Sequence, residues 1–177
     1  EIFDGQHYEQ FPVDVYQTGS GTSTNMNVNE VIANRSNQIR ADATKTGESK
    51  LCVHPNDDVN QSQSSNDTFP TAIHIAISLK IKTELLHELE HFHQALVQKS
   101  EAFKDVLKIG RTHLMDATPV SLGQEFGGYA KQLQYAIQRS NKALDALLEL
   151  PLGGTAVGTG LNCDKNFASK AIQIISL

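Results

Sequence analysis

The sequence has few cysteines, no cluster of basic residues and no long apolar run. Two cysteines, Cys52 and Cys163, are too few for a disulfide framework and predict free thiols in a reducing compartment. With a net charge of −5 and no Lys/Arg cluster, the chain offers no footprint for nucleic acid or an anionic membrane. His74, Lys80 and Lys82 interrupt the most apolar run, which falls short of the roughly 20 residues of a membrane span. We therefore expect a soluble protein with a packed core and small polar partners.

The two ends of the chain have no terminal signals. The sequence shows neither an initiator methionine nor a signal-like start, and it stops at AIQIISL inside a helical pattern. These ends predict a piece of a longer protein, so that any targeting segment would lie outside it.

Apolar residues recur at helical spacing in five segments: Val28 to Ile39, Ala72 to Ile81, Leu85 to Leu96, Leu122 to Leu147 and Phe167 to Ile175. The second segment is apolar nearly all round, which predicts a helix buried on most sides, with a kink near Thr83 before the third. Thr118 and Pro119 resemble an N-cap and first helical residue, and Ser121 with Gln124 has capping-box spacing. A helix of roughly 45 Å is expected to start there, and helices of this length usually lie in bundles.

The polar stretch from His54 to Ser65 precedes one of these helices. We expect Asn66 or Asp67 to cap the helix and Pro70 to lie in its first turn, where a missing N–H has no partner. The free amides and the helix dipole favour an anion such as a carboxylate, and Ser64, Ser65 and Asn66 add donors beside it.

Two further segments are rich in hydrogen-bond donors, Ser20 to Thr24 and Arg111 to His113. Asn25, Asn27 and Asn29 follow the first of these, and such poor helix formers suggest side chains used for bonding, although a solvated face on a capped helix is the alternative. If the three segments converge, they would hold an anionic substrate, with His113 as the best acid/base. The alternative for His113 is a surface or hydrogen-bonding histidine of a loop.

Two other motifs have simpler explanations. The run His87 to His91 reads HELEH and matches a zinc-protease pattern, but its histidines are expected to face solvent, away from the apolar stripe. The run Pro151 to Gly160 lacks the lysine of a Walker loop and predicts a tight, close-packed turn.

Four segments, in order, resemble motifs of the class II fumarases, within the fumarase/aspartase superfamily. They are GSGTSTNMNVNEVIANR, HPNDDVNQSQSSNDTFPTAIHIA, GRTHLMDATPVSLGQEFGGY and LGGTAVGTGLN, and the similarity spans about Phe11 to Asn162. His113 after Thr112 and the pair Ser64, Ser65 resemble fumarases, whereas aspartases tend to have Gln and Ser-Thr at those places.

The resemblance implies a mostly α fold, an incomplete long-helix bundle in which residues 1–17 end an N-terminal domain and residues 18–177 begin the central bundle. It implies a homotetramer whose active sites are each shared by three chains, in the cytoplasm or, in a eukaryote, the mitochondrial matrix. The implied activity is a lyase reaction of the tricarboxylic acid cycle, the reversible anti addition of water to fumarate to give L-malate, with neither metal nor organic cofactor.

The resemblance also implies roles for individual residues. His113 matches part of the acid/base apparatus, thought to act through a water. The residues that match substrate contacts are Ser20, Gly21, Thr22, Ser64, Ser65, Asn66 and Thr112. A secondary dicarboxylate site near the entrance is matched by His54, Asn56 and Asp57.

One family feature is missing from the sequence. The loop G-S-S-x-M-P-x-K-x-N-P, which supplies the serine thought to be the base, does not occur before Leu177. We therefore expect the 177-residue chain alone to be inactive. Two other classes stay open, namely another superfamily lyase such as an aspartate ammonia-lyase, and a non-enzymatic helical oligomerisation module.

Overall fold

The structure, a computed structural model, describes residues 1–17, 21–43 and 52–176. Most of them are helical, which confirms the predicted fold class. They form two units, Glu1–Ile73 with Leu150–Leu177, and His74–Glu149. Within the described ranges, no helix is long and apolar enough to cross a membrane.

The first unit contains the 3-10 helix η1 (Tyr8–Gln10), α1 (Thr22–Ala43), the π-helix η2 (Pro55–Val59), the beginning of α2 (Ser65–Lys80) and α5 (Phe167–Ile175). Helix α1 contacts η2. The helix expected around Val28 to Ile39 is confirmed in α1, and α5 has its predicted bounds.

The asparagines in the first turns of α1 bind through their side chains, as predicted. Asn25 donates to the Thr68 hydroxyl at 3.1 Å, and Asn27 donates to the Gln10 carbonyl at 2.9 Å. Asn29 is buried and donates to the side-chain oxygens of Asn25 and Asn60. These bonds, rather than a solvated polar face, fix α1 against its neighbours in the first unit.

Helix α2 begins earlier than the sequence suggested. Ser64 is its cap, because its hydroxyl accepts from the Asn66 amide at 3.2 Å while the Ser64 amide donates to Asp67 at 2.9 Å. The prediction that Pro70 lies in the first turn is wrong. Since the helix starts at Ser65, Pro70 falls in the second turn and has no N–H to offer the carbonyl four residues back.

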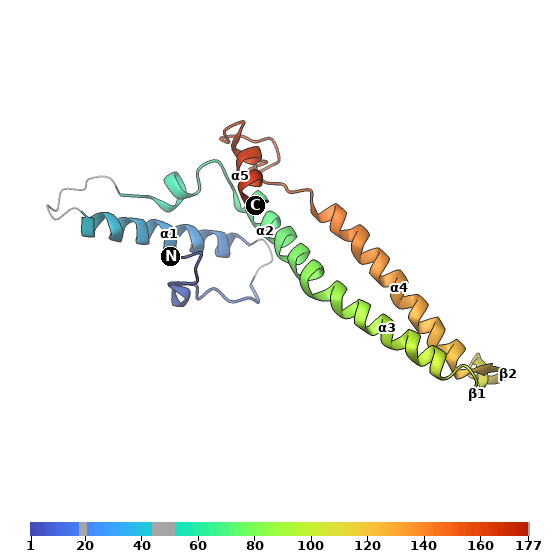
Figure 1. Ribbon diagram of the computed structural model, residues 1–177. Coiled ribbons are helices and arrows are strands. Elements are labelled where there is room, and N and C mark those ends of the chain that lie inside the picture. The colour runs from blue at the N-terminus through green and yellow to red at the C-terminus, as the bar shows by residue number, and fades with distance from the viewer. Residues whose placement is uncertain (18–20, 44–51, 177) are drawn as a thin grey trace. The chain divides into compact units, whose positions relative to one another are not determined.

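The second unit contains the end of α2, the π-helix η3 (Ile81–Leu85), α3 (Leu86–Ala102), the strands β1 (Leu107–Thr112) and β2 (Met115–Ser121), and α4 (Leu122–Leu147). Helices α3 and α4 run side by side in opposite directions (Figure 1). The change to π-helix at Ile81–Leu85 lies where a kink was expected near Thr83, whose hydroxyl donates to the Leu79 carbonyl at 2.7 Å.

The strands β1 and β2 form an antiparallel hairpin at one end of the α3–α4 pair (Figure 1). Ser121 caps α4 through the predicted capping box with Gln124. The alternative start at Thr118 and Pro119 is wrong, because both residues belong to β2, where Pro119 pairs with Ile109.

Few apolar side chains of the described chain are buried. The buried ones are Val31, Ala33 and Ala130, whereas Ile73, Ile77 and Leu79 of α2 are each more than 40% exposed. The expectations of a packed core and of an α2 buried on most sides are therefore wrong for this chain taken by itself. The apolar periodicity of these helices indicates surfaces that must pack against other elements. A single chain of these elements leaves those surfaces exposed.

Gly123→Ala is expected to weaken the α3–α4 contact. An added Cβ would lie 2.4 Å from the Ser100 carbonyl oxygen and 2.7 Å from the Lys104 Cα. Since backbone cannot move away cheaply, we expect a loss of about 2 kcal/mol in the free energy of unfolding, measured by urea denaturation.

Gly128→Ala is the matched control on the same helix, because no atom lies within 4 Å of its added Cβ. It should gain about 0.5–1 kcal/mol from helix propensity. A stabilised Gly123→Ala would contradict the close approach of the two helices.

Candidate functional site

The beginnings of α1 and α2 meet in the first unit. The Thr22 hydroxyl, on the first residue of α1, lies 3.3 Å from the Ser65 hydroxyl, on the first residue of α2. Gly21 precedes α1 with φ 69°, and an added Cβ there would lie 2.2 Å from the Phe69 ring. Only glycine fits both this conformation and this contact, so Gly21 sets the close approach of the two helix N-termini.

The first turn of α2 also binds the glycine-rich connection. Asn66 donates from its side-chain amide to the Ala156 carbonyl at 2.9 Å. Ser64, Ser65 and Asn66 thus lie on a turn that is fixed on two sides, by α1 and by the segment around Ala156. The glycine-rich run therefore acts as the tight, close-packed turn that its composition predicted.

Asp67 holds this arrangement together. Its side chain is 1% exposed, the largest fully buried side chain among the described residues. One carboxylate oxygen accepts from the Ser64 amide at 2.9 Å, and the other accepts from the Gly153 and Thr155 amides at 3.0 and 2.8 Å. Three backbone donors satisfy the buried charge, which would otherwise be costly to remove from water. From the sequence, Asp67 is predicted only as a helix cap, because its partners Gly153 and Thr155 are far away in the chain.

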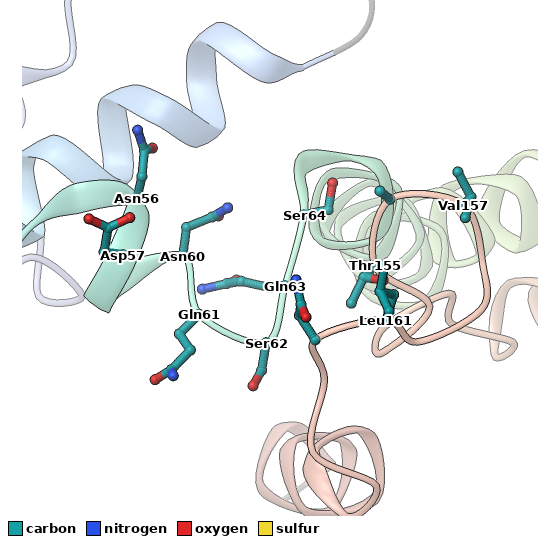
Figure 2. Close-up of a pocket in the computed structure, with 12 residues that line it drawn as sticks. Asn56, Asp57, Asn60, Gln61, Ser62, Gln63, Ser64, Thr155, Val157 and Leu161 are labelled. Atoms are coloured by element: carbon teal, nitrogen blue, oxygen red, sulfur yellow. The ribbon is translucent and has the colours of Figure 1, made fainter.

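A cavity of about 610 Å³ lies beside these bonds (Figure 2). The segment from Asn56 to Ser64 lines one side, and the connection from Thr155 to Asn162 lines the other. The buried Thr155 hydroxyl has no hydrogen-bond partner among the described residues, and its backbone is left-handed with φ 59°. Amides and hydroxyls dominate the lining, so the cavity suits a small polar molecule.

The residues expected at a secondary site lie on η2. His54 caps η2, and its Nδ1 accepts from the Asn56 and Asp57 amides, both at 3.3 Å. The Asp57 carboxylate also lies 3.3 Å from this nitrogen, but an ion pair needs a proton on Nδ1 whereas the amide bonds need a lone pair. The two amide bonds favour the neutral ring with its proton on Nε2. The Asp58 carboxylate accepts from the His54 amide at 2.7 Å, so two carboxylates, those of Asp57 and Asp58, flank this segment.

Thr112 and His113 lie in the second unit, at the tip of the hairpin. Thr112 pairs with Met115, so His113 and Leu114 form a two-residue loop. Their φ angles are 48° and 60°, the left-handed pair that a type I′ turn requires and that side chains other than glycine rarely adopt. Both residues are exposed. Left-handed backbone at residues other than glycine is strained, and such residues often occur at functional sites.

The structure thus brings together some of the predicted site residues. Gly21, Thr22, Ser64, Ser65 and Asn66 gather where α1 and α2 begin. Ser20 lies outside the described residues. Thr112 and His113 belong to the other unit, so the convergence of all three donor-rich segments stays a prediction.

Other candidate groups are isolated. The His87 and His91 rings of the HELEH motif are 4.8 Å apart on the exposed face of α3. Over the described ranges, no group of three or more His, Cys, Asp or Glu residues could hold a metal ion. Cys52 and Cys163 are free, and burial together with the charges of Asp67 and Asp164 raises the pKa of the Cys163 thiol. A raised pKa keeps that thiol protonated and poorly reactive at neutral pH.

Comparison with known proteins gives matches over the whole chain. Residues 1–177 match the model of a family described as lyase. The mitochondrial fumarate hydratase of Schizosaccharomyces pombe is 56% identical over 176 residues, which cover 99% of this chain and 33% of that protein. The class II fumarate hydratase of Yersinia pestis is 51% identical over 176 residues, covering 99% and 37%.

Solved structures agree with the sequence matches. The crystal structure of a recombinant class II fumarase from Schistosoma mansoni matches with a TM-score of 0.83 and 46% identity, covering 99% of this chain and 37% of that one. The chain therefore spans about a third of the length of the relatives it matches.

Asp67→Asn is expected to unfold the connection between α2 and the glycine-rich turn. An amide group turns one accepting oxygen into a donor, which would then face a backbone N–H. We expect a loss of about 3 kcal/mol in the free energy of unfolding, measured by urea denaturation.

Asp164→Asn is the control, because the Asp164 carboxylate is exposed and accepts from the neighbouring Asn166 amide at 2.8 Å. It should cost less than about 1 kcal/mol. Equal losses of unfolding free energy in the two variants would show that the buried bonds of Asp67 stabilise the protein no more than the exposed bond of Asp164 does.

Proposed function

The chain belongs to the lyase family of the class II fumarases, as its four motifs indicated, and from this premise we propose that the full-length protein is a fumarate hydratase. The proposal concerns the full-length protein, because this chain spans about a third of its relatives. The substrates are the dicarboxylates fumarate and L-malate.

The geometric observation that supports this activity is the meeting of two helix N-termini at Thr22 and Ser65. Each helix N-terminus carries a partial positive charge of about half a unit, so two of them together favour an anion. Hydroxyl groups at both termini, with the Asn66 amide beside them, add donors whose geometry suits a carboxylate. The neighbouring cavity is lined by amides, hydroxyls and apolar side chains, and Asp57 is the one charged residue in that lining.

The proposed reaction needs stabilisation of a second negative charge. In the dehydrating direction, a base removes the C3 proton of malate and the electron pair spreads onto the neighbouring carboxylate. The C2–O bond then breaks as the hydroxyl takes up a proton and leaves as water, and the double bond of fumarate forms. Donors fixed in advance around the carboxylate lower the barrier, because they need no reorganisation as its charge grows.

His113 is assigned to the acid/base apparatus of this reaction. An imidazole can both donate and accept a proton, and the turn presents His113 at an exposed tip rather than in a core. Thr112, next to it, is assigned to substrate binding, together with Ser20, Gly21, Thr22, Ser64, Ser65 and Asn66. His54, Asn56 and Asp57 are assigned to a secondary dicarboxylate site, where the nearby carboxylates would weaken anion binding.

The proposal extends to assembly and location. We assign a homotetramer, in which the exposed apolar faces of α2, α3 and α4 would be covered by other copies. Neither a metal nor an organic cofactor is assigned to the reaction, and neither nucleic acid nor membrane is a proposed partner. The assigned compartment is the cytoplasm, or the mitochondrial matrix if the source is eukaryotic.

Ultraviolet absorbance tests the proposal directly. The full-length protein is incubated with L-malate, and in parallel with L-aspartate, while the conjugated double bond of fumarate is followed. Absorbance that rises with malate alone supports a fumarate hydratase. A rise with aspartate alone would instead assign an ammonia-lyase, and no rise with either would favour a helical oligomerisation module.

His113→Asn is expected to reduce malate turnover by 100-fold or more, on the order of what loss of an acid/base group costs. Asparagine tolerates the left-handed backbone at this position, so the thermal midpoint should change little. His87→Asn, an exposed histidine of α3, is the control and should keep full activity. Normal turnover by His113→Asn would remove His113 from the reaction.

The 177-residue chain alone is expected to show no appreciable hydratase activity. The family loop that supplies the base does not occur in its sequence, so a required proton acceptor is missing. Fumarate absorbance from L-malate is measured for the isolated chain and for the full-length protein at equal concentration. A similar rate from both would sink this prediction.

A further inference from the structure

The attachment of the hairpin to α4 decides where its tip points. At the base of the hairpin, the Leu122 amide donates to the Val106 carbonyl at 2.8 Å, and the Gly123 amide donates to the Phe103 carbonyl at 2.9 Å. From Arg111 to Pro119 the hairpin residues are exposed. The hairpin is therefore an exposed arm, and contacts near its base set the direction in which its tip points.

One side-chain cluster joins the arm to the helix. Lys108 of β1 forms an ion pair with Glu125 in the first turn of α4, and the Tyr129 hydroxyl donates to the other Glu125 oxygen at 2.9 Å. Both oxygens of Glu125 are engaged, one by the strand and one by the helix. The Lys108 and Glu125 side chains are only about a third exposed, at 33% and 32%. We name these three residues the hairpin clamp.

Tyr129 is itself positioned by aromatic packing. Its ring lies 6.0 Å from the Phe126 ring in an edge-to-face arrangement, and Phe126 lies 5.5 Å from Phe103 at the end of α3. The clamp is thus built on the packed end of the α3–α4 pair, and only the Lys108 side belongs to the arm.

Because the arm is long, a small tilt at the clamp produces a larger displacement of the tip. His113 lies five positions along the chain from Lys108, which is about 16 Å of strand, so a tilt of about 4° at Lys108 moves the tip by about 1 Å. A displacement of 1 Å is enough to lower a rate by about 100-fold when a reacting group must be in place. An ion pair that contributes little to stability can therefore have a large effect on the position of His113.

The charges at the clamp keep it formed at neutral pH. The ion pair with Lys108, helped by the Tyr129 hydroxyl and the charge of Arg111, lowers the pKa of Glu125 below the ordinary 4.5. A lowered pKa means that the stabilisation is fully present above 4.5 and is lost only as the pH falls through the lower value. The same carboxylate raises the pKa of Tyr129, so the phenol stays a donor.

We propose that Glu125 is a positioning residue for His113: its carboxylate joins Lys108 to Tyr129 and so fixes the direction in which the hairpin presents Thr112 and His113. The inference rests on the proposed function, because His113 matters only if it takes part in the reaction. Glu125 itself does not touch the substrate and acts through the hairpin.

The test uses the full-length protein with Glu125→Gln, which keeps an oxygen for the Tyr129 hydroxyl but removes the ion pair with Lys108. We expect kcat for malate to fall roughly 10- to 100-fold with KM within about threefold, because positioning of the reacting group is lost while substrate contacts remain. Glu125→Asp keeps the charge and should recover part of kcat. Glu101→Gln, which breaks the exposed pair between Glu101 of α3 and Lys104 just beyond it, is the control and should leave kcat unchanged.

Hydrogen exchange of residues 107–121 gives a reading that does not depend on activity. Exchange in the hairpin should be faster in Glu125→Gln than in the unsubstituted protein, and unchanged in Glu101→Gln. Equal exchange, an unchanged kcat, or a loss of kcat explained by lost thermal stability alone would each overturn the proposal. If the unsubstituted protein fails to convert malate, the proposed function fails, while faster exchange would still establish the clamp.

Discussion

The buried carboxylate of Asp67 is the contact on which the first unit depends. Its three amide donors come from the cap of α2 and from the glycine-rich connection, so one side chain fixes two segments at once. A carboxylate withdrawn from water is tolerated only when such donors are all in place. The first turn of α2, with its serines and asparagine, therefore takes its position together with the connection or not at all.

Local signals explain what the sequence predicted correctly. The capping box at Ser121 and Gln124, the bounds of α5 and the use of asparagine side chains in α1 all depend on residues close in the chain or on intrinsic preferences. The start of α2 was predicted too late, because Asn66 and Asp67 are equally good caps in isolation and the choice of Ser64 is made by Asp67 turning back to its amide.

Distant partners explain what the sequence could not give. The residues beside the site, Ser64 to Asn66, were found from their donors, but the role of Asp67 depends on Gly153 and Thr155, and that of Glu125 depends on Lys108. The spacing of residue types along the sequence does not predict such pairs. Burial of α2 was predicted from its apolar sequence, but Ile77 and Leu79 are exposed. An apolar helix face indicates that it packs against something, and it does not identify the element or chain that packs there.

The division of the chain has a consequence for the order of synthesis. The first unit is made of two stretches, and the whole second unit lies between them in the sequence. Gly153 and Thr155, the partners of Asp67, follow Asp67 by 86 and 88 residues. At 5 to 20 residues per second, a ribosome needs roughly 4 to 18 s to supply them. Helices α3 and α4 are joined by 19 residues, so their contacts close a shorter stretch of chain than the bonds of Asp67 do. In the nascent chain, α3 and α4 of the second unit can therefore pair before the Gly153 and Thr155 amides are available to bind Asp67 of the first unit.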